Sequence, residues 1–206
     1  MVYKILLIGS SPRIGLTFYF TRLAIAFKRM GINVVVLSDK NEQYSNLPNE
    51  LESWNIKRYV SPKLHKVDLM GIIKDISLIR TIINNEGDFD FILGGGVREG
   101  IKLWASKKKL GNKPMNICVV GSFPSRRIEQ FIAITSYNMF YDKCIALSKY
   151  SKRQLINLSL KPNKIWVIYL FAPDLVWFDG AKQLKVNLET YNLQDVEHPV
   201  IFYAAS

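Results

Sequence analysis

The sequence predicts an α/β protein with a Rossmann-like, doubly wound parallel sheet and helices on both faces of that sheet. Three observations support this prediction. Short apolar segments alternate with helical patterns along most of the chain. The predicted strands are apolar at successive positions, which is typical of strands buried on both faces. The helical segments between them are about 10–18 residues long, the length of crossovers between parallel strands.

The N-terminal part of the chain supplies the first strand–helix–strand unit. An apolar run at residues 3–8 predicts a strand. Apolar side chains at positions 20, 23, 24 and 27 recur at helical spacing, so we expect a helix over residues 16–30, which Gly31 ends. The next apolar run, residues 33–37, predicts a second strand. These elements indicate two parallel strands joined by a helix.

The middle of the chain continues the alternation after a polar segment. Residues 41–55 are polar and rich in turn-forming residues, and a short strand is expected at residues 57–60. Six isoleucines at helical spacing predict a helix over residues 69–85. A strand at residues 89–93 runs into three glycines, and a further helix is expected over residues 97–110.

The last predicted elements end in a second strand–helix–strand unit. Residues 115–120 predict a strand and residues 125–140 a helix. The unit at residues 145–170 begins with an apolar strand that ends in Ser148, which can cap a basic amphipathic helix. A Lys-Pro-Asn break then leads to a strand over residues 165–170. Such a unit places the start of a helix at the carboxyl ends of parallel strands.

The pattern changes beyond residue 178, which indicates a domain boundary. We expect residues 1–178 to form the Rossmann-like domain and residues 179–198 to form a polar linker. Residues 199–206 then predict the first strand of a second, C-terminal domain.

The positive charge of the chain is concentrated in one third of it. The net charge is +11, and residues 97–164 hold fourteen Lys or Arg residues but only Glu99, Glu129 and Asp142 as acidic ones. In the other 138 residues fourteen basic residues balance fourteen acidic ones. Such a local excess favours an anionic partner: a lipid headgroup surface, a diphosphate or nucleic acid. For the lysine run at 107–109 alone, a solubilising helix face is the preferred explanation.

Four loops at predicted strand ends are rich in glycine, serine and cations, and in a parallel sheet such loops face the ligand. The first loop follows the opening strand and contains Gly9, Ser10, Arg13 and Gly15. A glycine loop before a helix can approach a phosphate, but a plain tight turn explains these residues equally well. The spacing is not G-x-G-x-x-G, so the dinucleotide fingerprint is incomplete.

The second loop begins with three consecutive glycines. Glycine loses more conformational entropy on folding than any other residue, so the run needs a reason. Either a substrate lies against this backbone or the turn needs positive φ. The candidate binding residues of this loop are Gly94, Gly95, Gly96, Arg98 and Glu99.

The third and fourth loops each combine a helix cap with cations. We expect Ser125 to cap the helix after the third loop. Two arginines in its first turn oppose the helix dipole, and a bound anion would explain them. The candidate binding residues of these loops are Gly121, Ser122, Arg126, Arg127, Ser148 and Lys149.

The helix after the third loop has an uncharged stretch, residues 130–141. The preferred interpretation is a helix buried in the core. The alternative is a basic-then-apolar helix that lies in a membrane interface. In that case Lys102 and the lysines at 107–109 would add attraction to anionic lipid.

The sequence carries few groups suited to covalent or metal chemistry. His65 and His198 lie far apart, and no Cys/His metal spacing, nucleophile elbow or Walker loop is present. We therefore predict no metal site. Cys118 and Cys144 occupy strand-like positions, and we expect buried free thiols in a reducing cytoplasm. No apolar run reaches the length of about 18 residues that a spanning helix needs.

The order of these parts resembles the N-terminal, acceptor-side domain of a GT-B glycosyltransferase, most closely the family 4 group of retaining enzymes. RMGINVVVLS resembles the end of the family's first strand–helix–strand unit, and ISLIRTIINNEGDFDFILGGG resembles its helix leading into a later strand. IALSKYSKRQLINLSLKPNKIWVIYLFAPDLVWF matches the family pattern best. HPVIFYAAS resembles the first strand of the nucleotide-sugar-binding domain. The resemblance covers nearly the whole chain.

The sequence departs from the family pattern in three places. The Asn-Gly of the exit motif is replaced around residues 170–173, although Asp174 and Phe178 are retained. The histidine that often follows the fourth or fifth strand is replaced by glycines or by Gly121-Ser122. Residues 1–206 include only the predicted first strand of the second domain and not the family's acidic sugar-nucleotide motif. The resemblance therefore assigns acceptor-side positions but no catalytic residue.

The resemblance implies a glycosyltransferase that moves a sugar from a nucleotide-diphosphate sugar to a glycan or lipid-linked acceptor. We expect this chain to bind no cofactor and to be inactive without the second domain, which would hold most of the nucleotide sugar. The alternative is a non-catalytic acceptor- or membrane-binding module that recruits a separate donor-binding chain. We expect a cytoplasmic protein that attaches peripherally to the inner face of an anionic membrane. Nucleic-acid binding is disfavoured because no recognition motif accompanies the charge.

Overall fold

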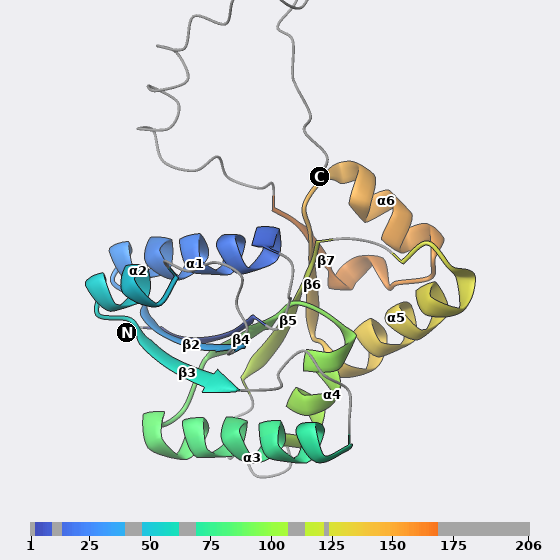
Figure 1. The fold of residues 1–206 in the computed structure, drawn as a ribbon. Helices are drawn as coiled ribbons and strands as arrows, with labels where there is room; N and C mark the ends of the chain where they lie inside the picture. The colour runs from blue at the N-terminus through green and yellow to red at the C-terminus, as the bar shows by residue number, and fades with distance from the viewer. Residues whose placement is uncertain are drawn as a thin grey trace, which may run out of the picture. The chain divides into compact units, whose positions relative to one another are not determined.

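The computed structural model describes residues 3–9, 14–39, 47–61, 69–106, 114–121 and 124–168 (Figure 1). All of them belong to the first of two compact units, Met1–Leu170, and the second unit is Phe171–Ser206. The predicted linker and the predicted last strand lie outside the described residues, and so does the predicted domain boundary at residue 178.

Seven strands form one sheet in the described part of the chain, and every neighbouring pair is parallel. The strand order is β3-β2-β1-β4-β5-β6-β7, so the order reverses between β1 and β4. The strands are β1 (Lys4–Gly9), β2 (Asn33–Asp39), β3 (Lys57–Ser61), β4 (Phe91–Gly94), β5 (Met115–Val120), β6 (Lys143–Ala146) and β7 (Ile165–Val167).

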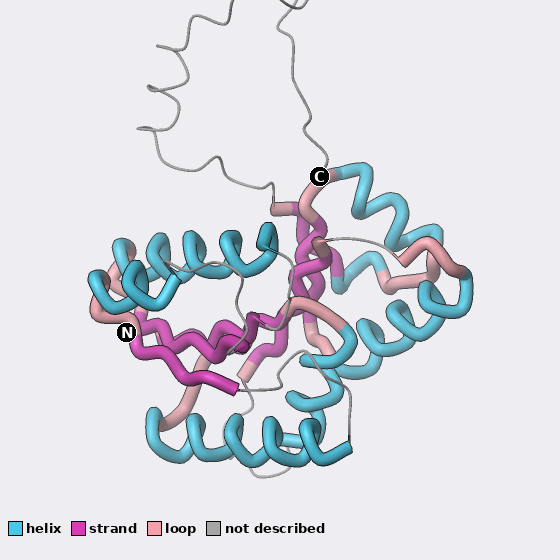
Figure 2. Tube along the Cα trace, in the orientation of Figure 1, coloured by secondary structure: helices cyan, strands magenta, loops and turns pink. Residues whose placement is uncertain are grey.

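Helices cover both faces of the sheet (Figures 1 and 2). The helices are α1 (Ile14–Arg29), α2 (Leu47–Ser53), α3 (Leu69–Glu86), α4 (Val97–Ser106), α5 (Arg127–Phe140) and α6 (Lys149–Asn157), with a 3-10 turn at Pro162–Lys164. Apolar side chains of α1 and α2 pack on one face, and those of α3, α4 and α5 pack on the other. The predicted fold class, a Rossmann-like parallel sheet covered on both faces, is confirmed.

The central strand β1 shows why its sequence is continuously apolar. Leu6 and Ile8 face the α3–α5 side, whereas Ile5 and Leu7 face the α1 side, and all four are buried. Alternate side chains of a strand point to opposite faces, so a strand covered on both sides needs apolar residues at every position.

Two sequence predictions about the helices were wrong. The polar residues 41–55 were described as turn-rich and assigned no helix, but α2 lies within them and buries Leu51 against the α1 face. The helix predicted to begin at Ser125 begins at Arg127. Its N-cap residue is Arg126, which makes no side-chain capping bond, so Ser125 does not cap the helix. The first backbone bond within the helix runs from the N–H of Gln130 to the Arg126 carbonyl, at 3.0 Å.

Acidic residues close the amino edge of the sheet, opposite the ligand-binding edge. Asp90 Oδ2 accepts the backbone N–H of Lys4 at 2.8 Å, and Asp142 Oδ2 accepts that of Asn116 at 2.8 Å. Each carboxylate thereby ties the start of one strand to the residue that precedes its neighbour. These two acidic side chains serve the fold.

A buried ion pair joins α3 to α4. Lys102 Nζ lies 2.6 Å from Asp75 Oδ2, and the two side chains are only 1% and 2% exposed. The hydroxyl of Ser61, the last residue of β3, donates to the other Asp75 oxygen. The pair therefore links two helices to the end of an edge strand without contact with solvent.

We predict that Lys102→Met lowers the free energy of unfolding by about 3 kcal/mol, because it leaves the Asp75 carboxylate buried without its cation. Chemical denaturation followed by circular dichroism measures the change. The double variant Asp75→Leu/Lys102→Met should recover part of the loss, since no buried charge remains. A loss below about 1 kcal/mol for the single variant would contradict the importance of the pair.

Candidate functional site

The four predicted loops all lie at the carboxyl edge of the sheet. Gly9 ends β1 and Gly94 ends β4, and Ile8 is paired with Gly94 across the two strands. These glycines therefore flank the point where the strand order reverses, which is where open parallel sheets bind ligands. Gly121 follows β5, and Ser148 follows β6, the next strand along.

The structure describes only part of the first and third loops. Gly9 lies at the end of β1 and Gly15 in the first turn of α1. Ser10, Arg13 and Ser122 lie outside the described residues. A phosphate-binding role of the first loop therefore stays a prediction.

The glycines of the second loop make room for side chains of the chain itself. A Cβ atom added to Gly94 would lie 3.1 Å from Glu99 Cβ, and one added to Gly96 would lie 3.1 Å from Glu99 Oε2. The described glycines with positive φ are Gly31 and Gly87, which rules out the alternative that this turn needs positive φ. Close packing against Glu99 Cβ explains Gly94 without a ligand, whereas Gly96 meets only the movable end of the Glu99 side chain.

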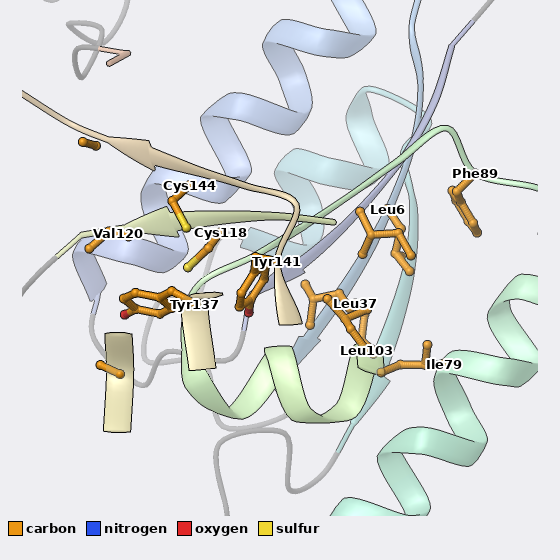
Figure 3. Packing of buried hydrophobic residues seen from close by; sticks show 14 of the residues in the cluster. Leu6, Leu37, Ile79, Phe89, Leu103, Cys118, Val120, Tyr137, Tyr141 and Cys144 are labelled. Atoms are coloured by element: carbon orange, nitrogen blue, oxygen red, sulfur yellow. The ribbon is translucent and has the colours of Figure 1, made fainter. Parts of the chain in front are cut away.

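Tyr141 holds the second loop in place. Its hydroxyl donates a hydrogen bond to the carbonyl of Gly96. A Cβ atom on Gly100 would lie 2.7 Å from a ring carbon of Tyr141, a distance that real side chains do not tolerate. Figure 3 shows Tyr141 and Tyr137 beside Cys118 and Cys144, which come from the neighbouring strands β5 and β6. The loop thus rests on a packed aromatic layer.

Glu99 is a buried acid in the first turn of α4. Burial raises the pKa of its carboxyl above the usual 4.5 and outweighs its own backbone N–H and the cation of Lys102, which both lower it. Its Oε1 has no hydrogen-bond partner among the described residues. Glu99 is therefore buried beneath the glycine loop and is not exposed at the carboxyl edge of the sheet.

We predict that Glu99→Gln gains stability relative to the wild type as pH rises. The folded state holds the Glu99 proton more tightly than the unfolded chain, so this group stabilises the fold at low pH. That contribution is lost as pH rises from about 4.5 through the raised pKa, and glutamine does not titrate. Urea unfolding of both proteins from pH 4 to pH 8 measures the difference. A difference that is constant, or that shrinks with rising pH, would contradict the burial of the acid.

Both cysteines are buried free thiols, as predicted. They face each other across β5 and β6, and burial raises the pKa of the Cys118 thiol well above its usual value. Cys118 is therefore not suited to act as a nucleophile, because the thiolate is the reactive form. Among the described residues no group of three His, Cys, Asp or Glu side chains could hold a metal ion.

The fourth loop forms the helix cap that the sequence predicts. The backbone N–H of Ser151 donates to Ser148 Oγ at 2.9 Å, which satisfies one of the free donors at the start of α6. Lys149 follows as the first residue of the helix and is exposed. The predicted cap of α6 is confirmed.

A basic pocket opens beside this cap. It has a volume of about 510 Å³, lies between α6 and the end of β7, and is lined by Lys149, Lys152, Arg153, Ile156 and Val167. Sequence reasoning missed Lys152 and Arg153. Their spacing from Lys149, three and four positions along a helix, places all three cations on one face and could have identified them.

The cations of the third loop lie at the start of α5. Arg126 and Arg127 are both exposed, and Arg126 lies 4.0 Å from Glu129 within the same turn. The two arginines are therefore available to an anion at the carboxyl edge. Lys102, in contrast, is buried against Asp75, so its predicted role in attracting lipid was wrong. The lysines at 107–109 lie outside the described residues.

The preferred interpretation of residues 130–141 as a core helix was correct for only one face of α5. Ala133, Ile134 and Tyr137 are buried in the core. Phe131 and Met139 are more than half exposed. The absence of charge in this stretch therefore produces an apolar surface as well as a buried face.

The sequence matches no protein-family model, and comparison with curated proteins also gives no match. Solved structures with the same fold are found at low sequence identity. A glycosyltransferase from Rickettsia africae ESF-5 matches with a TM-score of 0.69 and 18% identity, over 92% of this chain and 48% of that one. Anabaena Alr3699/HepE in complex with UDP-glucose matches with a TM-score of 0.59 and 14% identity, over 87% and 49%.

Another enzyme class shares the fold. The UDP-N-acetylglucosamine 2-epimerase from Rickettsia bellii matches with a TM-score of 0.59 and 16% identity, over 93% of this chain and 52% of that one. The chain therefore has the fold of glycosyltransferases and of these epimerases, in agreement with the GT-B expectation. It spans about half the length of the structures it matches. Membership of family 4 stays a prediction.

Proposed function

We propose that this chain is the acceptor-side half of a glycosyltransferase that transfers a sugar from a nucleotide-diphosphate sugar to a glycan or lipid-linked acceptor. One observation carries the proposal: nearly the whole chain matches one half of a glycosyltransferase structure from Rickettsia africae. The complex of the HepE structure with UDP-glucose supports a nucleotide sugar as donor. The acceptor class rests on the basic charge around the carboxyl edge.

In this proposal the chain contributes binding and positioning. The described part of the edge offers exposed cations and helix N-termini, which suit phosphate groups. Lys149, Lys152 and Arg153 would hold an anionic group of the acceptor or the donor diphosphate in the basic pocket. Fixed cations that face a leaving diphosphate stabilise its charge without reorganisation, and a positioned acceptor hydroxyl lowers the entropic cost of reaction.

The proposal is tested by nucleotide release with the protein expressed from its entire coding sequence. We expect that a panel of nucleotide-diphosphate sugars includes one donor whose nucleotide is released faster when a membrane-lipid extract is added as the acceptor source. The double variant Lys152→Ala/Arg153→Ala should lower the acceptor-dependent rate by about tenfold or more, because two cations facing the ligand are lost. Lys74→Ala, an exposed cation on α3, is the matched control and should leave the rate unchanged.

Acceptor-independent conversion of UDP-N-acetylglucosamine to its 2-epimer would contradict transfer and favour the epimerase chemistry of the other structures with this fold. If no donor is turned over, the alternative of a non-catalytic acceptor- or membrane-binding module is favoured. In that case affinity purification of the intact protein should recover a separate chain that binds the nucleotide sugar.

A further inference from the structure

We propose that the outer face of α5, together with the two arginines at its start, is a surface that lies in the headgroup region of an anionic bilayer. The proposal names the contacting helix and rests on its own observations. It does not require that the chain transfers a sugar.

The outer face of α5 is an apolar stripe that nothing in the described structure covers. Ile128, Phe131, Ile132 and Met139 are between 51% and 75% exposed. Their spacing of three, four and seven residues places them on one side of the helix, with Thr135 between them. Apolar side chains that cluster on one exposed face mark an interaction site, whereas scattered ones do not.

A neighbouring helix also exposes an aromatic side chain. Trp104 of α4 is 52% exposed, and its ring lies 5.9 Å from the ring of Phe140 near the end of α5. Tryptophan is enriched at the level of lipid headgroups because its ring is apolar and its N–H is polar. Trp104 is therefore a further exposed aromatic side chain close to the end of α5.

The arginines sit at the end of the stripe that meets the carboxyl edge. Arg126 and Arg127 are exposed at the start of α5, directly before Ile128. Helices that lie in a membrane interface combine an apolar face with cations that meet anionic headgroups. Contact along this face would bring the carboxyl edge of the sheet close to the membrane surface.

The charge favours a bilayer over a second copy of this chain. A two-fold contact through α5 would bring two identical patches together, and with them two pairs of exposed arginines. Each patch holds two exposed arginines and one exposed acid, Glu129, so this contact would join two patches that are both net positive. An anionic bilayer supplies both an apolar interior and the opposite charge. No helix in the described part of the chain has the length and hydrophobicity to cross a membrane.

Vesicle co-sedimentation of the whole chain tests this surface. We expect binding to vesicles of 70% phosphatidylcholine and 30% phosphatidylglycerol, and much weaker binding to pure phosphatidylcholine. Phe131→Ser should weaken binding to the anionic vesicles about tenfold, since a ring no longer enters the interface. Arg126→Ala/Arg127→Ala should weaken it about tenfold or more and reduce its salt dependence.

Matched variants on α3 show whether weaker vesicle binding is specific to α5 or follows from any loss of exposed apolar or basic side chains. Ile73 is 52% exposed and Lys74 is exposed, so Ile73→Ser and Lys74→Ala should bind as the wild type does. Circular dichroism confirms that each variant is folded. Vesicles with brominated acyl chains should quench tryptophan fluorescence in the wild type, and less so in Trp104→Phe.

Equal binding to neutral and anionic vesicles, or equal loss of binding in the α3 variants, would overturn the proposal. Sedimentation velocity tests whether a second copy of this chain binds to the face instead. A wild-type dimer that Phe131→Ser converts to a monomer, without vesicle binding by either, would assign the face to a second copy and also overturn it. Because no donor or acceptor is present, these outcomes are independent of the proposed transferase activity.

Discussion

Parallel pairing of all the described strands is the constraint on which the rest of the structure depends. It requires a helical crossover after almost every strand, and it places every loop from a strand into a helix at one edge. It also buries both faces of the sheet, which is why β1 is apolar at successive positions. The two edges then differ in chemistry. Asp90 and Asp142 secure backbone N–H groups at the amino edge, while Arg126 and Lys149 are exposed at the carboxyl edge.

In the glycine loop after β4, packing within the chain accounts for glycines that the sequence alone attributes to a ligand. Three consecutive glycines suggest a ligand, but Gly94 is explained by the close approach of Glu99 Cβ, and the nearby Gly100 by that of the Tyr141 ring. The buried acid and the aromatic ring thus determine the local backbone. Any ligand at the point where the strand order reverses would meet a loop shaped from behind by Tyr141 and Glu99, and its charged partners must come from the neighbouring cations.

The sequence was sufficient to predict the fold class. A strand covered on both faces appears in the sequence as a continuous apolar run, and its crossover helix appears as apolar residues at helical spacing. The sequence also identified the Ser148 cap, which depends only on neighbouring residues. The sequence did not predict which side chains are buried where contacts between distant segments determine the burial. Lys102 looks like a surface cation but is buried against Asp75, 27 positions away along the chain. An uncharged stretch such as residues 130–141 does not reveal which of its faces the core covers, so Phe131 was expected inside and lies outside.

We propose that the carboxyl edge of the sheet, and not another surface, receives the anionic ligand. Hydrogen–deuterium exchange of the intact protein with and without millimolar UDP or inorganic pyrophosphate tests it most directly. We expect slower exchange in peptides that cover residues 94–100, 124–130 and 148–153, and unchanged exchange at the amino edge around residues 87–90 and 141–143. Protection confined to the amino edge, or none at any described residue, would contradict it.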